Sequence, residues 1–183
     1  MKKYSILVAL FASTLFASCM KDNETKFEGD FVEMDAAVYT ANSAGVTYPI
    51  ITRLPGYGQP IISANIAASG SFPAIPADPL ITRASGTIKF RVNLVGPQRS
   101  TATTVSYTAA GFGTNPAVAG THFTTGNTVE IPANSSFGEI SVQIINPGVA
   151  SATARDFVIT LTGASNLPPS ENEKSVGIRI SQL

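Results

Sequence analysis

The chain has 183 residues, and the first 18 have the pattern of an export signal, so the mature protein would have 165. That length suits one domain of ordinary size and is short for two. Lys and Arg together number 12, as do Asp and Glu, and loss of Lys2 and Lys3 with the signal leaves 10 basic against 12 acidic side chains. A net charge near −2 excludes electrostatic binding of nucleic acid or anionic lipid as the main activity. The 44% hydrophobic content is too high for a disordered chain.

The N-terminal segment has the parts of a secretory signal. Residues 1–3 are short and basic, residues 6–17 are an apolar stretch of 12, and small residues stand directly before Cys19. The apolar stretch is shorter than the roughly 20 residues that a membrane-spanning helix needs. Cys19 is the only cysteine, so an intramolecular disulfide cannot form.

The sequence Leu15-Phe16-Ala17-Ser18-Cys19 resembles the lipobox of bacterial lipoproteins, with Phe16 in place of the usual aliphatic residue. The resemblance implies that residues 1–18 are a lipoprotein signal peptide and that Cys19 becomes the lipidated N-terminus. Its acyl chains would hold the protein to a membrane, because each buried methylene contributes about 0.8 kcal/mol.

Met20 to Glu24, directly after the cysteine, resemble the Lys-plus-acid signals that send lipoproteins of gut-type Gram-negative bacteria to the outer face of the outer membrane. We therefore expect a lipid-anchored outer-membrane protein that faces the cell exterior. An ordinary charged tether would have the same composition. Residues 19–29 are polar without periodicity, which is typical of a flexible tether.

From residue 30 onward, apolar residues recur with a period of two. The clearest strand is Thr87 to Val95, where Ile88, Phe90, Val92 and Leu94 alternate with polar residues, as in an antiparallel sheet with one solvated face. The other predicted strands are Phe31 to Tyr39, Thr103 to Ala109, Thr128 to Ile131, Glu139 to Ile145, Asp156 to Thr162 and Lys174 to Ser181. Seven short strands separated by turn signals, without an amphipathic helical stretch, predict an all-β fold. We expect one antiparallel, immunoglobulin-like β-sandwich over residues 30–183.

A long insertion after the first strand does not fit a plain sandwich. Residues 41–85 contain six prolines and four glycines. A connection of this length is unusual in a compact domain, so we expect an irregular segment that is either functional or poorly ordered. Tyr48 to Thr52 and Gln59 to Ile66 could form strand fragments within it.

The second half of the chain resembles a known family. The resemblance is found in four segments: Ala119-Gly120-Thr121-His122-Phe123, Val129 to Ala133, Glu139 to Ile144 and Phe157 to Leu161. Over roughly residues 86–181 they resemble the Calx-beta-like domain and related sandwich domains of Sus-like surface lipoproteins, which implies a β-sandwich.

In that family, a Gly-x-Asp-Tyr turn and an acidic run before the penultimate strand can supply calcium ligands. This chain has His122 and Phe123 in place of Asp-Tyr, and Val149 to Arg155 in place of the acidic run, which leaves Asp156 alone. Calcium prefers six to eight oxygen ligands, so we expect no calcium or other metal site and no cofactor.

Few residues could support catalysis. His122 is the only histidine available as a base, and its turn motif predicts a structural role at a strand end. The sequence has no zinc-binding cluster, nucleophile elbow or phosphate-binding loop. Glycoside hydrolysis needs only two carboxylates, but solvation of an edge strand explains Glu33 and Asp35 better. We expect no enzyme activity.

Binding is the expected activity, because loops at strand ends can vary without disturbing the core. Tyr48, Tyr57 and Phe72 are the aromatic residues least explained by strand alternation, and sugar rings stack on aromatic faces. The amides of Gln59 and Asn65 are nearby in sequence. The alternative is that these aromatic rings fix the insertion to the sandwich.

Two hypotheses of function follow. In the first, a non-enzymatic surface lipoprotein binds a polysaccharide or protein partner in a Sus-like nutrient-uptake system, a context that comes from the resemblance alone. In the second, the sandwich is a structural or protein-interaction subunit of a cell-surface assembly. An exposed apolar patch would favour a protein partner, and a polar groove with exposed rings would favour a sugar.

Overall fold

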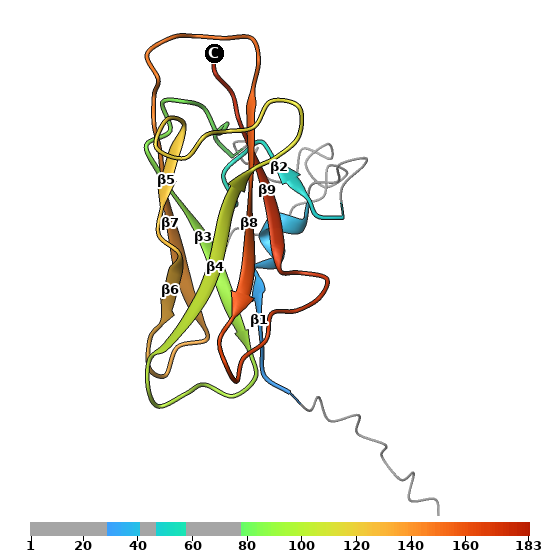
Figure 1. The fold of residues 1–183 in the computed structure, drawn as a ribbon. Coiled ribbons are helices and arrows are strands. Elements are labelled where there is room, and N and C mark those ends of the chain that lie inside the picture. Colours follow the sequence, from blue (N-terminus) through green and yellow to red (C-terminus); the bar gives the residue numbers. More distant parts are fainter. Residues whose placement is uncertain (1–28, 41–46, 58–77) are drawn as a thin grey trace, which may run out of the picture.

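In a computed structural model of the chain, residues 29–40, 47–57 and 78–183 are described (Figure 1). The predicted signal peptide, Cys19, Phe72 and most of the predicted tether lie outside the described residues. Within the described ranges, no helix has the length and apolar character needed to cross a bilayer.

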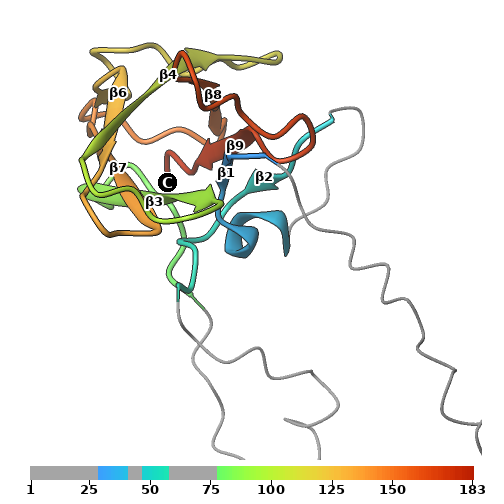
Figure 2. The ribbon, with the colours of Figure 1, turned by 90° about the horizontal axis from the view of Figure 1, so that it is seen from below.

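Two β-sheets pack face to face, which confirms the predicted all-β sandwich. Sheet A has the strand order β1-β3-β7-β5, and sheet B has the order β2-β9-β8-β4-β6. The strands are β1 (Phe31–Met34), β2 (Ile50–Ile51), β3 (Thr87–Val95), β4 (Thr103–Gly111), β5 (Phe123–Thr125), β6 (Thr128–Ile131), β7 (Phe137–Ile144), β8 (Arg155–Gly163) and β9 (Ser175–Ile180). Figure 2 views the sandwich from below, with β3 and β7 on one side and β4 and β8 on the other.

The core lies between the sheets, where the alternating apolar residues of the strands meet. In β3, Ile88, Phe90, Val92 and Leu94 are buried, as the period of two predicts. Phe123 of sheet A stacks on Phe157 of sheet B, with ring centroids 4.2 Å apart and planes at 12°. The two faces are therefore joined by direct contact of large side chains.

The predicted strand from Phe31 to Tyr39 is wrong beyond Met34. After β1 the chain forms a 3-10 helix, η1 (Ala36–Thr40). Asp35 causes the change, because its Oδ1 accepts a hydrogen bond from the backbone N of Ala37 at 2.9 Å. Its carbonyl accepts one from the N of Val38 at 3.0 Å. A short carboxylate that binds the backbone two residues ahead favours a turn over a continuing strand.

Part of the insertion at residues 41–85 belongs to the sandwich. β2 falls within the predicted fragment Tyr48 to Thr52 and pairs with β9, in parallel, with Ile50 opposite Gly177. The two described arms of the insertion also pair with each other. Leu54 N donates to Pro79 O at 2.9 Å, and Ile81 N donates to Thr52 O at 2.9 Å.

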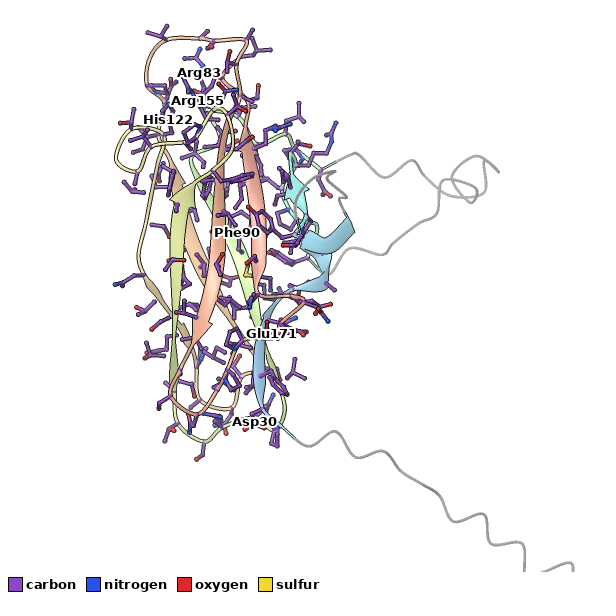
Figure 3. The ribbon with its side chains drawn as sticks, turned by 45° about the vertical axis from the view of Figure 1, so that its right-hand side comes forward. Asp30, Arg83, Phe90, His122, Arg155 and Glu171 are labelled. Carbon is purple, nitrogen blue, oxygen red and sulfur yellow. The ribbon has the colours of Figure 1, made fainter. Side chains whose placement is uncertain are left out.

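The two ends of the sandwich differ in their distance from the start of β1 (Figure 1). Asp30, where the described chain begins to enter β1, lies at one end, which we call the tether end (Figure 3). The opposite end, which we call the loop end, consists of residues 80–86, 112–122, 145–155 and 181–183. Figure 3 places Arg83, His122 and Arg155 at the loop end.

Candidate functional site

Tyr57 packs on the outer face of sheet A. Its hydroxyl accepts a hydrogen bond from the backbone N of Arg91 in β3 at 2.9 Å. Burial raises the pKa of Tyr57 to about 12, so the phenol keeps its proton at neutral pH. These are the contacts of a ring that fixes the insertion to the sheet.

Arg91 lies between two aromatic rings. Its guanidinium carbon is 4.8 Å from the ring centre of Tyr57 and 4.2 Å from that of Phe137. Its Nε is buried without a hydrogen-bond partner. Cation–π attraction of about 0.5–2 kcal/mol offsets part of the cost of burying this N–H group without an acceptor. The guanidinium therefore holds the start of β7 and the insertion together.

Tyr48 contacts a different part of the molecule. Its ring meets that of Phe112 edge-to-face, with centroids 5.7 Å apart and planes at 82°. It also covers Gly177 in β9, where a Cβ would lie 3.2 Å from the Tyr48 ring. The structure does not bring Tyr48 and Tyr57 together, and Phe72 is outside the described residues. The two described rings do not form one sugar-binding platform.

Replacing Tyr57 with Phe separates the hydrogen bond of its hydroxyl group from the packing of its aromatic ring. The change keeps the aromatic face but leaves the Arg91 N–H without its acceptor, so we expect the free energy of unfolding to fall by about 1–2 kcal/mol. Urea unfolding of the two variants measures this. Tyr48→Phe is the matched control, because the Tyr48 hydroxyl makes no hydrogen bond to a described residue, and we expect no change. Equal losses in both variants would contradict a bonding role for Tyr57.

Three carboxyl groups gather on the outer face of sheet A beside β1. Glu33 of β1 makes a side-chain hydrogen bond to Glu173 of the β8–β9 loop, and Asp35 lies close enough to act on Glu33 electrostatically. Burial, the largest cause, and the two neighbouring carboxyl groups raise the pKa of Glu33 to about 7. The sequence predicts Glu33 as a solvated residue. It misses this contact because Glu173 comes from a distant loop.

A carboxyl group with a pKa near 7 could donate a proton in catalysis, but catalysis also requires a substrate cleft. The nearby pocket between η1, β2 and Asp78 has a volume of about 180 Å³, and Glu33 does not line it. Ligand pockets are commonly about 300–1,000 Å³. This pocket therefore does not provide the carboxyl cluster with a substrate site.

His122 has the structural role that the sequence predicts. Its Nδ1 accepts a hydrogen bond from the backbone N of Val118 at 3.0 Å, and its own N donates to the Val118 carbonyl at 2.9 Å. The neutral ring therefore carries its proton on Nε2. His122 closes the turn that precedes β5.

Asp156 is paired, although the sequence leaves it without a neighbouring acid. Only 7% of it is exposed, and its carboxylate accepts hydrogen bonds from Arg179 Nε at 2.9 Å and Nη2 at 2.7 Å. The hydrogen bond to Asp156 raises the pKa of Arg179. Among the described residues, no group of three or more His, Cys, Asp or Glu side chains could hold a metal. The absence of calcium binding stays a prediction.

The loop end has exposed apolar side chains and a positive charge. Val118 is 53% exposed and Val149 is 74% exposed. The loop-end segments contain no Asp or Glu, whereas Arg83 and Arg155 lie there. Asp156, which follows directly in β8, is neutralised by Arg179. A surface with exposed apolar side chains and two partly exposed arginines thus lies at the end of the sandwich opposite Asp30.

Neither a scan of protein-family models nor a search of curated protein sequences finds a match to the chain. Solved structures with some likeness include CBD12 from CALX1.2, with a TM-score of 0.45 and 21% identity, over 55% of this chain and 40% of that one. A two-domain protein of unknown function from Bacteroides fragilis has a TM-score of 0.48 and 9% identity, over 84% of this chain and 45% of that one.

A candidate carbohydrate-binding protein from Bacteroides ovatus has a TM-score of 0.39 and 13% identity, over 54% of this chain and 32% of that one. The chain thus spans less than half the length of each of these three proteins. The likeness concerns the fold alone.

Proposed function

We propose that the protein is a lipid-anchored outer-membrane lipoprotein that acts by binding, without catalysis, and presents its loop end to an acidic protein partner at the cell surface. The observation that carries the proposal is the placement of the exposed apolar and cationic residues at the end opposite Asp30 (Figure 3). Acylation of Cys19 would hold the tether end near the membrane. The loop end would then face away from it.

The chemistry of the loop end favours a protein partner over a sugar. Its large exposed apolar side chains are all aliphatic, namely Leu80, Val118, Val149 and Leu183, whereas Tyr48 and Tyr57 are engaged within the chain. An apolar patch beside two arginines that form no salt bridge with a described residue suits a protein surface that combines apolar and acidic groups. Membership of a Sus-like uptake system belongs to the proposal and rests on the sequence resemblance alone. Binding of an acidic polysaccharide is the alternative.

Substitution of Val118 and Val149 by Asp tests the proposal. The double variant loses apolar contact and adds two charges of the sign of the partner, so we expect cross-linking of the acylated protein to a single outer-membrane partner to fall at least tenfold. That loss corresponds to about 1.4 kcal/mol or more of binding free energy. Quantitative cross-linking on intact cells measures it.

The matched control adds the same two charges at the tether end, through Ala102→Asp and Ala133→Asp, which are both exposed. We expect it to leave cross-linking unchanged. A glycan array that includes acidic polysaccharides is run on the same proteins. Glycan binding that is lost only in the Val118 and Val149 variant would replace the protein partner with a polysaccharide. If the Val118 and Val149 variant keeps both its cross-linking and its glycan binding, the loop end is not the binding site.

A further inference from the structure

A segment of the β8–β9 loop, residues 168–173, runs along the edge of β1 that β3 does not occupy. We call this segment the strap. Three backbone hydrogen bonds join it to β1: Val32 N to Pro168 O at 3.0 Å, Ser170 N to Val32 O at 2.8 Å, and Met34 N to Glu173 O at 2.7 Å. The strap thus covers the edge of a strand that would otherwise present unpaired backbone groups. Figure 3 shows Glu171 of the strap beside β1, above Asp30.

Two acidic side chains lie where the strap meets the C-terminal end of β1. Glu33 of β1 and Glu173 of the strap are joined by a hydrogen bond between their carboxyl groups. Such a bond needs one proton, because two carboxylates have acceptors only and repel each other. The pair therefore binds the strap to β1 only while it holds that proton.

No described cation neutralises this pair. Asp35, on the same segment as Glu33, adds a third negative group. The residue opposite Glu33 in β3 is Asn93, which is uncharged and donates its amide to Asp35 at 3.2 Å. Lys174, next to Glu173, is bound to Glu171 at 2.9 Å. Arg91 is held between Tyr57 and Phe137, and its guanidinium donates no hydrogen bond to a described residue.

We propose that Glu33 and Glu173 form a proton-dependent clasp, which holds the strap on β1 while they share a proton and releases it when both carboxyl groups are ionised. Release would uncover the N–H groups of Val32 and Met34. The edge of β1 beside the tether end would then be free to pair with another extended chain. The clasp does not depend on the loop end and stands or falls separately from the proposed function.

The direction of the pH effect follows from Glu33. Its pKa in the folded protein, about 7, lies above the ordinary value of 4.5. The folded state therefore binds the proton more tightly than the unfolded state does. The stabilisation is complete below pH 4.5 and is lost as the pH rises through 7.

Hydrogen exchange of the full chain at pH 5.5 and pH 8.5, corrected for the intrinsic exchange rate at each pH, tests the clasp. We expect the protection of the Val32, Met34 and Ser170 amides to fall by about tenfold or more at the higher pH. Protection of amides in the β3–β7 pairs should stay the same. Equal protection of the strap amides at both pH values would overturn the proposal.

Two variants in the same loop separate the clasp from a general effect of charge. Glu173→Gln keeps a donor to Glu33 at any pH, so we expect the strap amides to be protected equally at pH 5.5 and 8.5. Glu33→Gln should behave in the same way. The matched control is Glu171→Gln combined with Lys174→Gln, which removes the exposed ion pair without leaving a free cation beside Glu173 and should leave the pH dependence intact. A pH dependence that survives in both clasp variants, or that disappears in the Glu171 and Lys174 double variant, would contradict the clasp.

Discussion

Replacing Phe157 with Ala should lower the free energy of unfolding by about 3–5 kcal/mol. Phe157 is fully buried and stacks on Phe123, which is 1% exposed, at a centroid distance of 4.2 Å. The two rings belong to opposite sheets. The cavity left by the change would therefore lie between the sheets, where neither can close it without shifting the other.

Urea unfolding measures this loss, and Phe137→Ala is the matched control. Phe137 is 40% exposed at the start of β7 and contacts the Arg91 guanidinium. Its removal should cost about 1 kcal/mol, from lost surface contact and cation–π attraction. A similar loss in both variants would mean that the stack between the sheets contributes no more than a surface contact.

Replacing Gly138 with Ala should cost about 2–3 kcal/mol, the second largest loss that we expect. Gly138 is buried in β7, where β6 of the other sheet passes directly over it. A Cβ at this position would collide with the Glu130 carbonyl oxygen and lie 3.1 Å from the Val129 side chain. The backbone of β6 would have to move away, which would weaken the corner where the two sheets meet.

Thermal and urea unfolding of Gly138→Ala and Gly126→Ala test this prediction together. Gly126 lies in the turn between β5 and β6, and the nearest atom to a Cβ there is 3.5 Å away. We expect its replacement to have little effect, because the added methyl group meets only ordinary contacts. If Gly138→Ala unfolds at the same urea concentration as the unchanged protein, β6 and β7 are less tightly packed than described.

The long strands could be predicted from the sequence because one face of each is buried. β3 and β6 have the predicted bounds, and β7, β8 and β9 differ from prediction by one or two residues at their ends. The short elements could not be predicted in the same way. β2 has two residues and β5 has three, too few for an alternating pattern, and η1 depends on a turn made by Asp35.

The contacts that decide the candidate sites join residues far apart in the chain. Tyr57 and Arg91 are 34 positions apart, and the link between them follows from the path of the insertion over sheet A. The pairing of Glu33 with Glu173 depends on where the β8–β9 loop returns beside β1. Residue types indicated that Tyr57 needed an explanation beyond strand alternation. Only the arrangement of the segments shows that it packs on the protein itself.

The pairing of the two arms of the insertion has an evolutionary consequence. Because Thr52 and Leu54 bind Ile81 and Pro79, the chain leaves the sandwich and returns to it at one place. Closing a flexible loop costs only about 0.6 kcal/mol more for each doubling of its length, so the paired arms permit a change in the number of residues between Tyr57 and Asp78. The fold therefore accepts new sequence at this point, and proteins with the same sandwich could diverge here in length and composition while keeping both sheets.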